Sequence, residues 1–139
     1  RGLIMAVYAS MFTGSSPLQL QKNAPTREAA DKLFETQVRN SLAGRDANDM
    51  LYQFDSSRDY DPQPKLDQIK AHLIAINSAD DQTNPPELGI AEREIKKVKN
   101  GEFILIPISD ETRGHGTHSI PALWQQHLKS LLEKSETRH

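Results

Sequence analysis

The sequence predicts a mixed α/β fold built around one strand–helix–strand unit, and three observations favour it. Residues 73–77 and 103–108 are short apolar runs bounded by polar residues, as in strands buried on both faces. The segment 86–99 between them repeats apolar residues at helical spacing. A connection of this length lets the two strands lie parallel, with a right-handed crossover through the helix.

Two helices are expected before this unit. Residues 3–12 are mildly apolar and end at a turn-rich break. The first expected helix follows Thr26, which can cap it, and Gly44 can close it. Its apolar stripe consists of Ala30, Leu33, Phe34, Val38 and Leu42. A second, shorter helix is expected from Asp46, and it runs out in the polar loop 56–62.

A last amphipathic helix is expected to begin at Ser119, with Pro121 in its first turn. We therefore divide the chain into a helical lid or cap segment, residues 1–62, and an incomplete α/β domain, residues 63–139. Two parallel strands alone make a marginal sheet whose faces both need cover. The strand at 73–77 is therefore expected to pair with a further strand from an upstream segment or from another chain.

Composition excludes several functional classes. The 139 residues suit one domain, and a net charge of -2 gives no field that would gather nucleic acid. The apolar runs are too short to span a membrane, so neither a membrane nor a nucleic-acid partner is expected. Without cysteine, disulfides, thiolate catalysis and thiolate-bound metals are ruled out. A cytoplasmic location is expected, although the missing cysteines fit a secreted or periplasmic location as well.

Polar side chains follow both predicted strands, at the edge where open parallel sheets bind ligands. Asp80 and Asp81 come after the first strand, and His115 and His118 come after the second. Neighbouring parallel strands lie roughly 5 Å apart, so an acid of one loop can hydrogen-bond to a histidine of the other. Such a pair supplies the base and the orienting carboxylate of a Ser–His–Asp system, and its chain order agrees with that of α/β-hydrolases.

Plainer interpretations of these loops stay open. The two aspartates can form a solvated turn, and His115 can be an ordinary loop residue. His115 and His118 have the spacing of a metal-binding pair, but no helix presents them, and no metal site is predicted. No Gly-x-Ser-x-Gly string occurs in the sequence, and the near match at residues 14–17 contains a proline. The nucleophilic serine is therefore expected outside this chain.

Three strings resemble the homoserine O-acetyltransferase-like branch of the α/β-hydrolase superfamily: DANDMLYQFDSSRDYDP, AINSADDQTNPPELG and ILIPISDETRGHGTH. The resemblance runs from about Ser16 to Leu132 and covers only the C-terminal part of the family. It implies the last two parallel strands of an α/β-hydrolase fold with flanking helices, preceded by helical lid segments. The acid of the family lies four residues before a proline, which matches Asp81, with Asp80 as the runner-up. Its histidine follows a glycine and matches His115.

The resemblance implies transfer of an acetyl group from acetyl-CoA to a small molecule with a hydroxyl group, through an acyl-serine intermediate and without a bound cofactor. An esterase, or a non-catalytic fragment, would contain the same parts. Arg58 and Arg113 are candidates for binding a substrate carboxylate or a coenzyme phosphate. The serine and the oxyanion-hole amides would come from the N-terminal half of the same protein or from another chain, and formation of a homodimer stays open.

Overall fold

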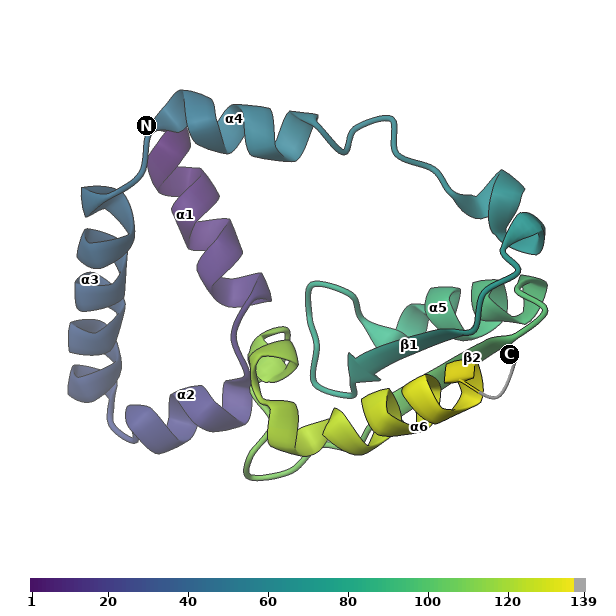
Figure 1. Cartoon of the computed structure of the whole chain (residues 1–139). Coiled ribbons are helices and arrows are strands. Elements are labelled where there is room, and N and C mark those ends of the chain that lie inside the picture. The colour runs from purple at the N-terminus through teal and green to yellow at the C-terminus, as the bar shows by residue number, and fades with distance from the viewer. Residues whose placement is uncertain (137–139) are drawn as a thin grey trace.

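The computed structural model describes residues 1–136, so residues 137–139 of the predicted α/β domain lie outside the described part. Within that part the fold is mixed α/β and mostly helical, with a two-stranded parallel sheet (Figure 1). The first half contains the helices α1 (Gly2–Thr13), α2 (Pro17–Asn23), α3 (Arg27–Ala43) and α4 (Ala47–Asp55). None of the described helices combines the length and the apolar character needed to cross a lipid bilayer.

Both helices expected before the sheet are present and begin at the predicted caps. The hydroxyl of Thr26 accepts a hydrogen bond from the N–H of Ala29, which starts α3. The carboxylate of Asp46 accepts hydrogen bonds from the N–H groups of Asn48 and Asp49, which start α4. The stretch before Thr26, for which no helix was predicted, is also helical. It contains α1 and α2, and the turn-rich break at Gly14–Ser16 lies between them.

The two strands pair in parallel, as predicted. The strand β1 (Leu73–Ser78) follows the 3₁₀ helix η1 (Gln63–Gln68), and β2 (Gly101–Ile106) lies beside it, with Leu73 opposite Gly101 and Ser78 opposite Ile106. The predicted bounds of the second strand were wrong by two residues at each end. Its end is explained by Pro107, which has no N–H group to continue the ladder.

The crossover from β1 to β2 is not the single helix that the apolar spacing predicts. It consists of the 3₁₀ helix η2 (Pro86–Leu88), the short helix α5 (Ile90–Glu94) and the 3₁₀ helix η3 (Ile95–Lys97). Gly89 lies between the first two with φ +63°, and a left-handed residue cannot continue a right-handed helix. Only the second half of the expected apolar face, Leu88, Ala91, Ile95 and Val98, is formed, since Ile95 and Val98 are buried whereas Leu88 and Ala91 are exposed.

The last helix also begins later than expected. Two 3₁₀ helices, η4 (Gly116–Ser119) and η5 (Pro121–Leu123), precede α6 (Gln125–Glu136). The hydroxyl of Ser119 donates to the carbonyl of Gly116 instead of capping a helix. The backbone of Trp124, with φ -134°, then separates η5 from α6.

The strands are less buried than the prediction of two covered faces requires. The helices α5 and α6 lie on either side of the sheet (Figure 1). Even so, Ile76 in β1 and Leu105 in β2 keep 36 % and 43 % of their surface exposed. A sheet of two strands is too narrow for its helices to enclose, so much of its apolar surface stays accessible.

Candidate active site

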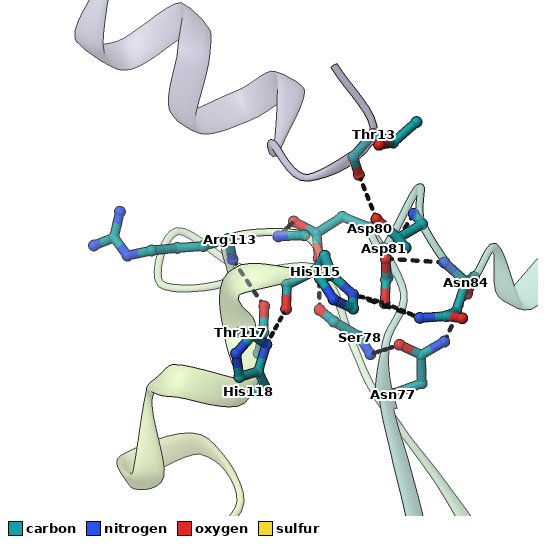
Figure 2. Close-up of polar contacts among 12 residues, drawn as sticks. Thr13, Asn77, Ser78, Asp80, Asp81, Asn84, Arg113, His115, Thr117 and His118 are labelled. Carbon is teal, nitrogen blue, oxygen red and sulfur yellow. Dashed lines mark hydrogen bonds and ion pairs between the residues drawn. The ribbon is translucent and has the colours of Figure 1, made fainter. Parts of the chain in front are cut away.

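Two loops leave the sheet at the same edge, because parallel strands end on the same side. The acid loop, residues 79–85, follows β1, and the histidine loop, residues 107–115, follows β2. Figure 2 shows that Asp81 and His115, one from each loop, point toward each other. The Asp81 Oδ2 and His115 Nδ1 atoms are 3.1 Å apart, which is hydrogen-bonding distance. The structure thus brings together the two residues that the sequence predicts, and we call them the Asp81–His115 dyad.

The local fold of the acid loop aims Asp81 at the histidine. Its Oδ1 atom accepts hydrogen bonds from the N–H groups of Thr83 (2.8 Å) and Asn84 (3.1 Å), the pattern of an Asx turn. That turn leaves Oδ2 for His115. The amide Nδ2 of Asn84 lies 3.5 Å from both Asp81 Oδ2 and His115 Nδ1, beside the bond that joins them.

These contacts keep the buried carboxylate of Asp81 ionised. Burial by itself would raise its pKa. The hydrogen bond from His115, the N–H groups of Asn84 and Thr83 and the charge of His115 outweigh burial, so the pKa of Asp81 is lowered. At neutral pH the loop therefore presents a negative charge to the imidazole.

The carboxylate also determines which ring nitrogen of His115 carries the proton. A carboxylate only accepts hydrogen bonds, so the neutral ring must be protonated at Nδ1 and leaves Nε2 with a lone pair. The side chain of His115 is 42 % exposed, and within residues 1–136 no side chain hydrogen-bonds to Nε2. This is the arrangement of a general base that is oriented by an acid and open to a reacting group.

Asp80, the alternative acid, has different partners. Its Oδ1 atom accepts a hydrogen bond from Ser78 Oγ (2.5 Å). Its Oδ2 atom accepts from Thr112 Oγ1 (3.1 Å) and from the N–H of Gly114 (3.0 Å). Burial alone would raise the pKa of Asp80, but the hydrogen bonds from Ser78, Gly114 and Thr112 outweigh it and lower that pKa. The carboxylate of Asp80 thus binds the histidine loop and not the imidazole.

An open cavity of about 600 Å³ adjoins the dyad. Asp81 and His115 contribute to its wall, and much of the rest is apolar, with Ile76, Phe103 and Trp124 among the lining residues. A volume of this size falls in the range of small-molecule sites. Of the two exposed strand residues noted above, Ile76 lines this cavity and Leu105 does not. The imidazole of His115 therefore shares the cavity with an exposed apolar side chain of β1.

The two arginines that the sequence suggests for substrate binding lie elsewhere. Arg58 forms an ion pair with Asp55 on an exposed segment after α4. The guanidinium of Arg113 extends away from the dyad (Figure 2), and its Nη1 donates to Gln19 Oε1 at 3.2 Å. Neither side chain lines the cavity beside His115.

The second predicted histidine, His118, lies in η4 and turns its ring toward the backbone. His118 Nδ1 lies 2.6 Å from the carbonyl oxygen of His115, and the two rings meet edge to face. Within residues 1–136, no group of three histidine, aspartate or glutamate side chains is arranged to bind a metal ion.

Sequence reasoning missed the side chains that support the dyad, above all Asn84, Ser78 and Thr112. The aspartate itself is a signal for an Asx turn, so the turn at Asp81 could have been found, but the turn uses only the backbone N–H of Asn84 and gives no signal for its side chain. Ser78 and Thr112 carry no such signal, because only the folded loops place their hydroxyl groups against Asp80.

Comparison with protein-family models, curated proteins and solved structures gives no match to this chain. The resemblance to homoserine O-acetyltransferases therefore stays a prediction from three strings of residues. The loop geometry, which is independent of that resemblance, is the stronger basis for a function.

Proposed function

We propose that this chain supplies the general base and the orienting acid of a serine-dependent acyltransferase. The observation that carries the proposal is the 3.1 Å contact between Asp81 Oδ2 and His115 Nδ1. In the neutral ring this contact leaves the lone pair on Nε2, and the ring lines a cavity of about 600 Å³. An oriented imidazole of this kind is the part of a Ser–His–Asp system that activates the nucleophile.

The proposed reaction has two steps. His115 Nε2 takes the proton of the serine hydroxyl, and the serine oxygen attacks the carbonyl of the acyl donor. The bond to the leaving group breaks, and that group takes the proton from Nε2. In the second step Nε2 takes the proton of an acceptor hydroxyl, whose oxygen attacks the acyl-serine. The bond between the acyl carbon and the serine oxygen breaks, and the serine takes the proton back from Nε2. Asp81 stabilises the imidazolium that forms in each step.

The nucleophile must reach the dyad from another part of the assembly. Within residues 1–136 no serine hydroxyl hydrogen-bonds to His115. We place the serine on the N-terminal half of an α/β-hydrolase fold, either upstream in the same protein or on another chain, with β1 and β2 as its last strands. The exposed surface of the sheet supports an arrangement in which further elements cover it.

The identity of donor and acceptor comes from the resemblance alone. It favours acetyl-CoA as the donor, which would place the reaction in the cytoplasm, and a hydroxyl of a small molecule as the acceptor. An esterase would use water in the same second step. The ratio of acetyl transfer to acetate release, measured with homoserine present and absent, distinguishes the two reactions.

The test is acylation of the native polypeptide, recovered from its source by a tag fused at the C-terminus of the complete protein. Treatment with p-nitrophenyl acetate should add one acetyl group to a serine, detected by intact-mass spectrometry and peptide mapping. His115→Ala should abolish this labelling, whereas His127→Gln, a histidine change on α6 outside the dyad, should not. Labelling that persists at the wild-type rate in His115→Ala would contradict the proposal.

A further inference from the structure

We propose that Asp80 is a positioning residue for the dyad and holds His115 against Asp81 by binding the backbone of the histidine loop. The inference rests on the proposed function for the importance of the dyad, but its geometry is independent of any reaction. Two consecutive carboxylates thus have separate partners: Asp81 binds the imidazole, and Asp80 binds the loop that carries the imidazole.

The contacts of Asp80 join the end of β1 to the residue before the histidine. Oδ1 is bound by Ser78, the last residue of β1. Oδ2 accepts from the N–H of Gly114, which is directly followed by His115. Thr112 donates to the same oxygen. Its hydroxyl also accepts from the N–H of Ser109, a hydrogen bond within the histidine loop. Charge-assisted hydrogen bonds of this kind are stronger than neutral ones.

Gly114 transmits this contact to the histidine because its backbone has little room to move. Its φ is +57°, and a Cβ atom at this position would lie 2.7 Å from the carbonyl oxygen of Ser15 and 3.2 Å from that of Asp80. The glycine is therefore enclosed between the acid loop and the turn that joins α1 to α2. Releasing its N–H from Asp80 would free the backbone that sets the position of the His115 ring.

The test uses the titration of Asp81 in the full chain, followed by the ¹³C chemical shift of its carboxyl group. In Asp80→Ala we expect the pKa of Asp81 to rise toward its ordinary value, because the hydrogen bond and charge of His115 help to lower it. Loss of the neighbouring negative charge alone would lower the pKa of Asp81 further. A rise therefore reports the loss of contacts that lower this pKa, of which the hydrogen bond from His115 is the largest.

Asp80→Asn is the matched conservative variant. Its amide oxygen can accept from Gly114 and Thr112 while its amide nitrogen donates to Ser78 Oγ. We expect the pKa of Asp81 in this variant to stay low. Asp110→Asn is the second control, since it removes an exposed carboxylate of the histidine loop that pairs with Lys22, and it should leave Asp81 unchanged.

Ser78→Ala keeps the proposal testable if Asp80→Ala does not fold. It frees only Oδ1 of Asp80 and should raise the pKa of Asp81 by a smaller amount. An unchanged or lowered pKa of Asp81 in every folded variant would overturn the proposal, as would an equal rise in Asp80→Asn and Asp80→Ala. Because no turnover is measured, this result is separate from the acylation test of the proposed function.

Discussion

The loops and the strands of the α/β part differ in how they are buried. Thr112 in the histidine loop is 0 % exposed and Asp81 in the acid loop is 6 % exposed, whereas Ile76 and Leu105, in the strands, remain about two-fifths exposed. These two polar residues of the sheet edge are thus more enclosed than Ile76 and Leu105, although Ile106 at the end of β2 is buried. Hydrogen bonds between the loops therefore hold the site together beside a small apolar core.

The two kinds of residue should respond differently to substitution. An apolar side chain that is half-exposed buries little surface, so its truncation removes little stabilising free energy. A buried polar group that loses its partner costs about 1–3 kcal/mol, since it is neither solvated nor paired. Substitutions in the loops should therefore be more damaging than substitutions in the strands.

The largest effect is expected for Gly114→Ala. The added methyl would meet the carbonyl of Ser15 at 2.7 Å, and alanine is strained at φ +57°. We expect the free energy of unfolding to fall by about 2–3 kcal/mol. Gly116→Ala is the control, because its Cβ would meet only the side chain of Arg113, at 3.6 Å, and should change stability by less than about 0.5 kcal/mol. Urea denaturation followed by circular dichroism measures both, and equal effects would contradict the enclosed position of Gly114.

Two substitutions compare the loop with the strand directly: Thr112→Val in the histidine loop and Leu105→Ala in β2. The valine keeps the shape of Thr112 but loses the hydrogen bond that the hydroxyl donates to Asp80 and the one that it accepts from the N–H of Ser109. This loss should cost about 2 kcal/mol. Leu105 is already 43 % exposed, so its truncation should cost only about 1 kcal/mol, below the range for buried leucines. If the leucine variant is the less stable of the two, the sheet and not the loop network dominates.

Acid should lower the stability of the folded chain through the two carboxylates of the acid loop. The pKa values of Asp80 and Asp81 are lowered in the folded chain, so their contribution is complete above the unfolded pKa of about 4 and is lost as pH falls through the folded values. Unfolding free energies measured between pH 6 and pH 2.5 should therefore decrease below pH 4. The decrease should be smaller in Asp80→Asn than in the wild type, while Asp59→Asn, on the exposed segment after α4, should leave it unchanged. An equal decrease in wild type and Asp80→Asn would contradict this.

The smallest effect is expected at the exposed rim of the histidine loop. Lys22 Nζ lies 2.7 Å from Asp110 Oδ1, and both side chains are substantially exposed. Surface ion pairs of this kind contribute from nearly zero to about 1 kcal/mol, so Lys22→Met should lower stability by less than about 0.5 kcal/mol. A loss of stability as large as that of Thr112→Val would mean that the ion pair with α2 stabilises the loop as much as the buried hydrogen bonds do.

Local pattern and topology were enough to predict the two strands, the helices α3 and α4, and a contact between the two loops. Two apolar runs separated by a helical segment predict the parallel pair, and the carboxyl ends of such strands bring the acid loop and the histidine loop to one edge. The caps at Thr26 and Asp46 follow from their side chains. The interruption at Gly89 could not be predicted, because glycine adopts either sign of φ and apolar spacing does not reveal which.

The choice between Asp80 and Asp81 shows where sequence reasoning ends. Both residues lie in the acid loop, and topology alone allows either of them to face the histidine; only the resemblance favours Asp81. The structure separates them through donors that have no sequence periodicity: the Asx-turn amide of Thr83 for one, and the hydroxyl of Thr112 for the other. Such contacts exist only after the two loops have met, so residue spacing alone does not determine them.

The central claim is that Asp81 fixes the proton of His115 on Nδ1 and leaves Nε2 free, and the ¹⁵N chemical shifts of the imidazole test it most directly. With the ring neutral, we predict a protonated Nδ1 and an unprotonated Nε2 for His115 in the full chain. In Asp81→Ala the proton should move largely to Nε2, the form that imidazole prefers without a partner, and His118→Gln assigns the signals. The same tautomer in the wild type and in Asp81→Ala would contradict the claim.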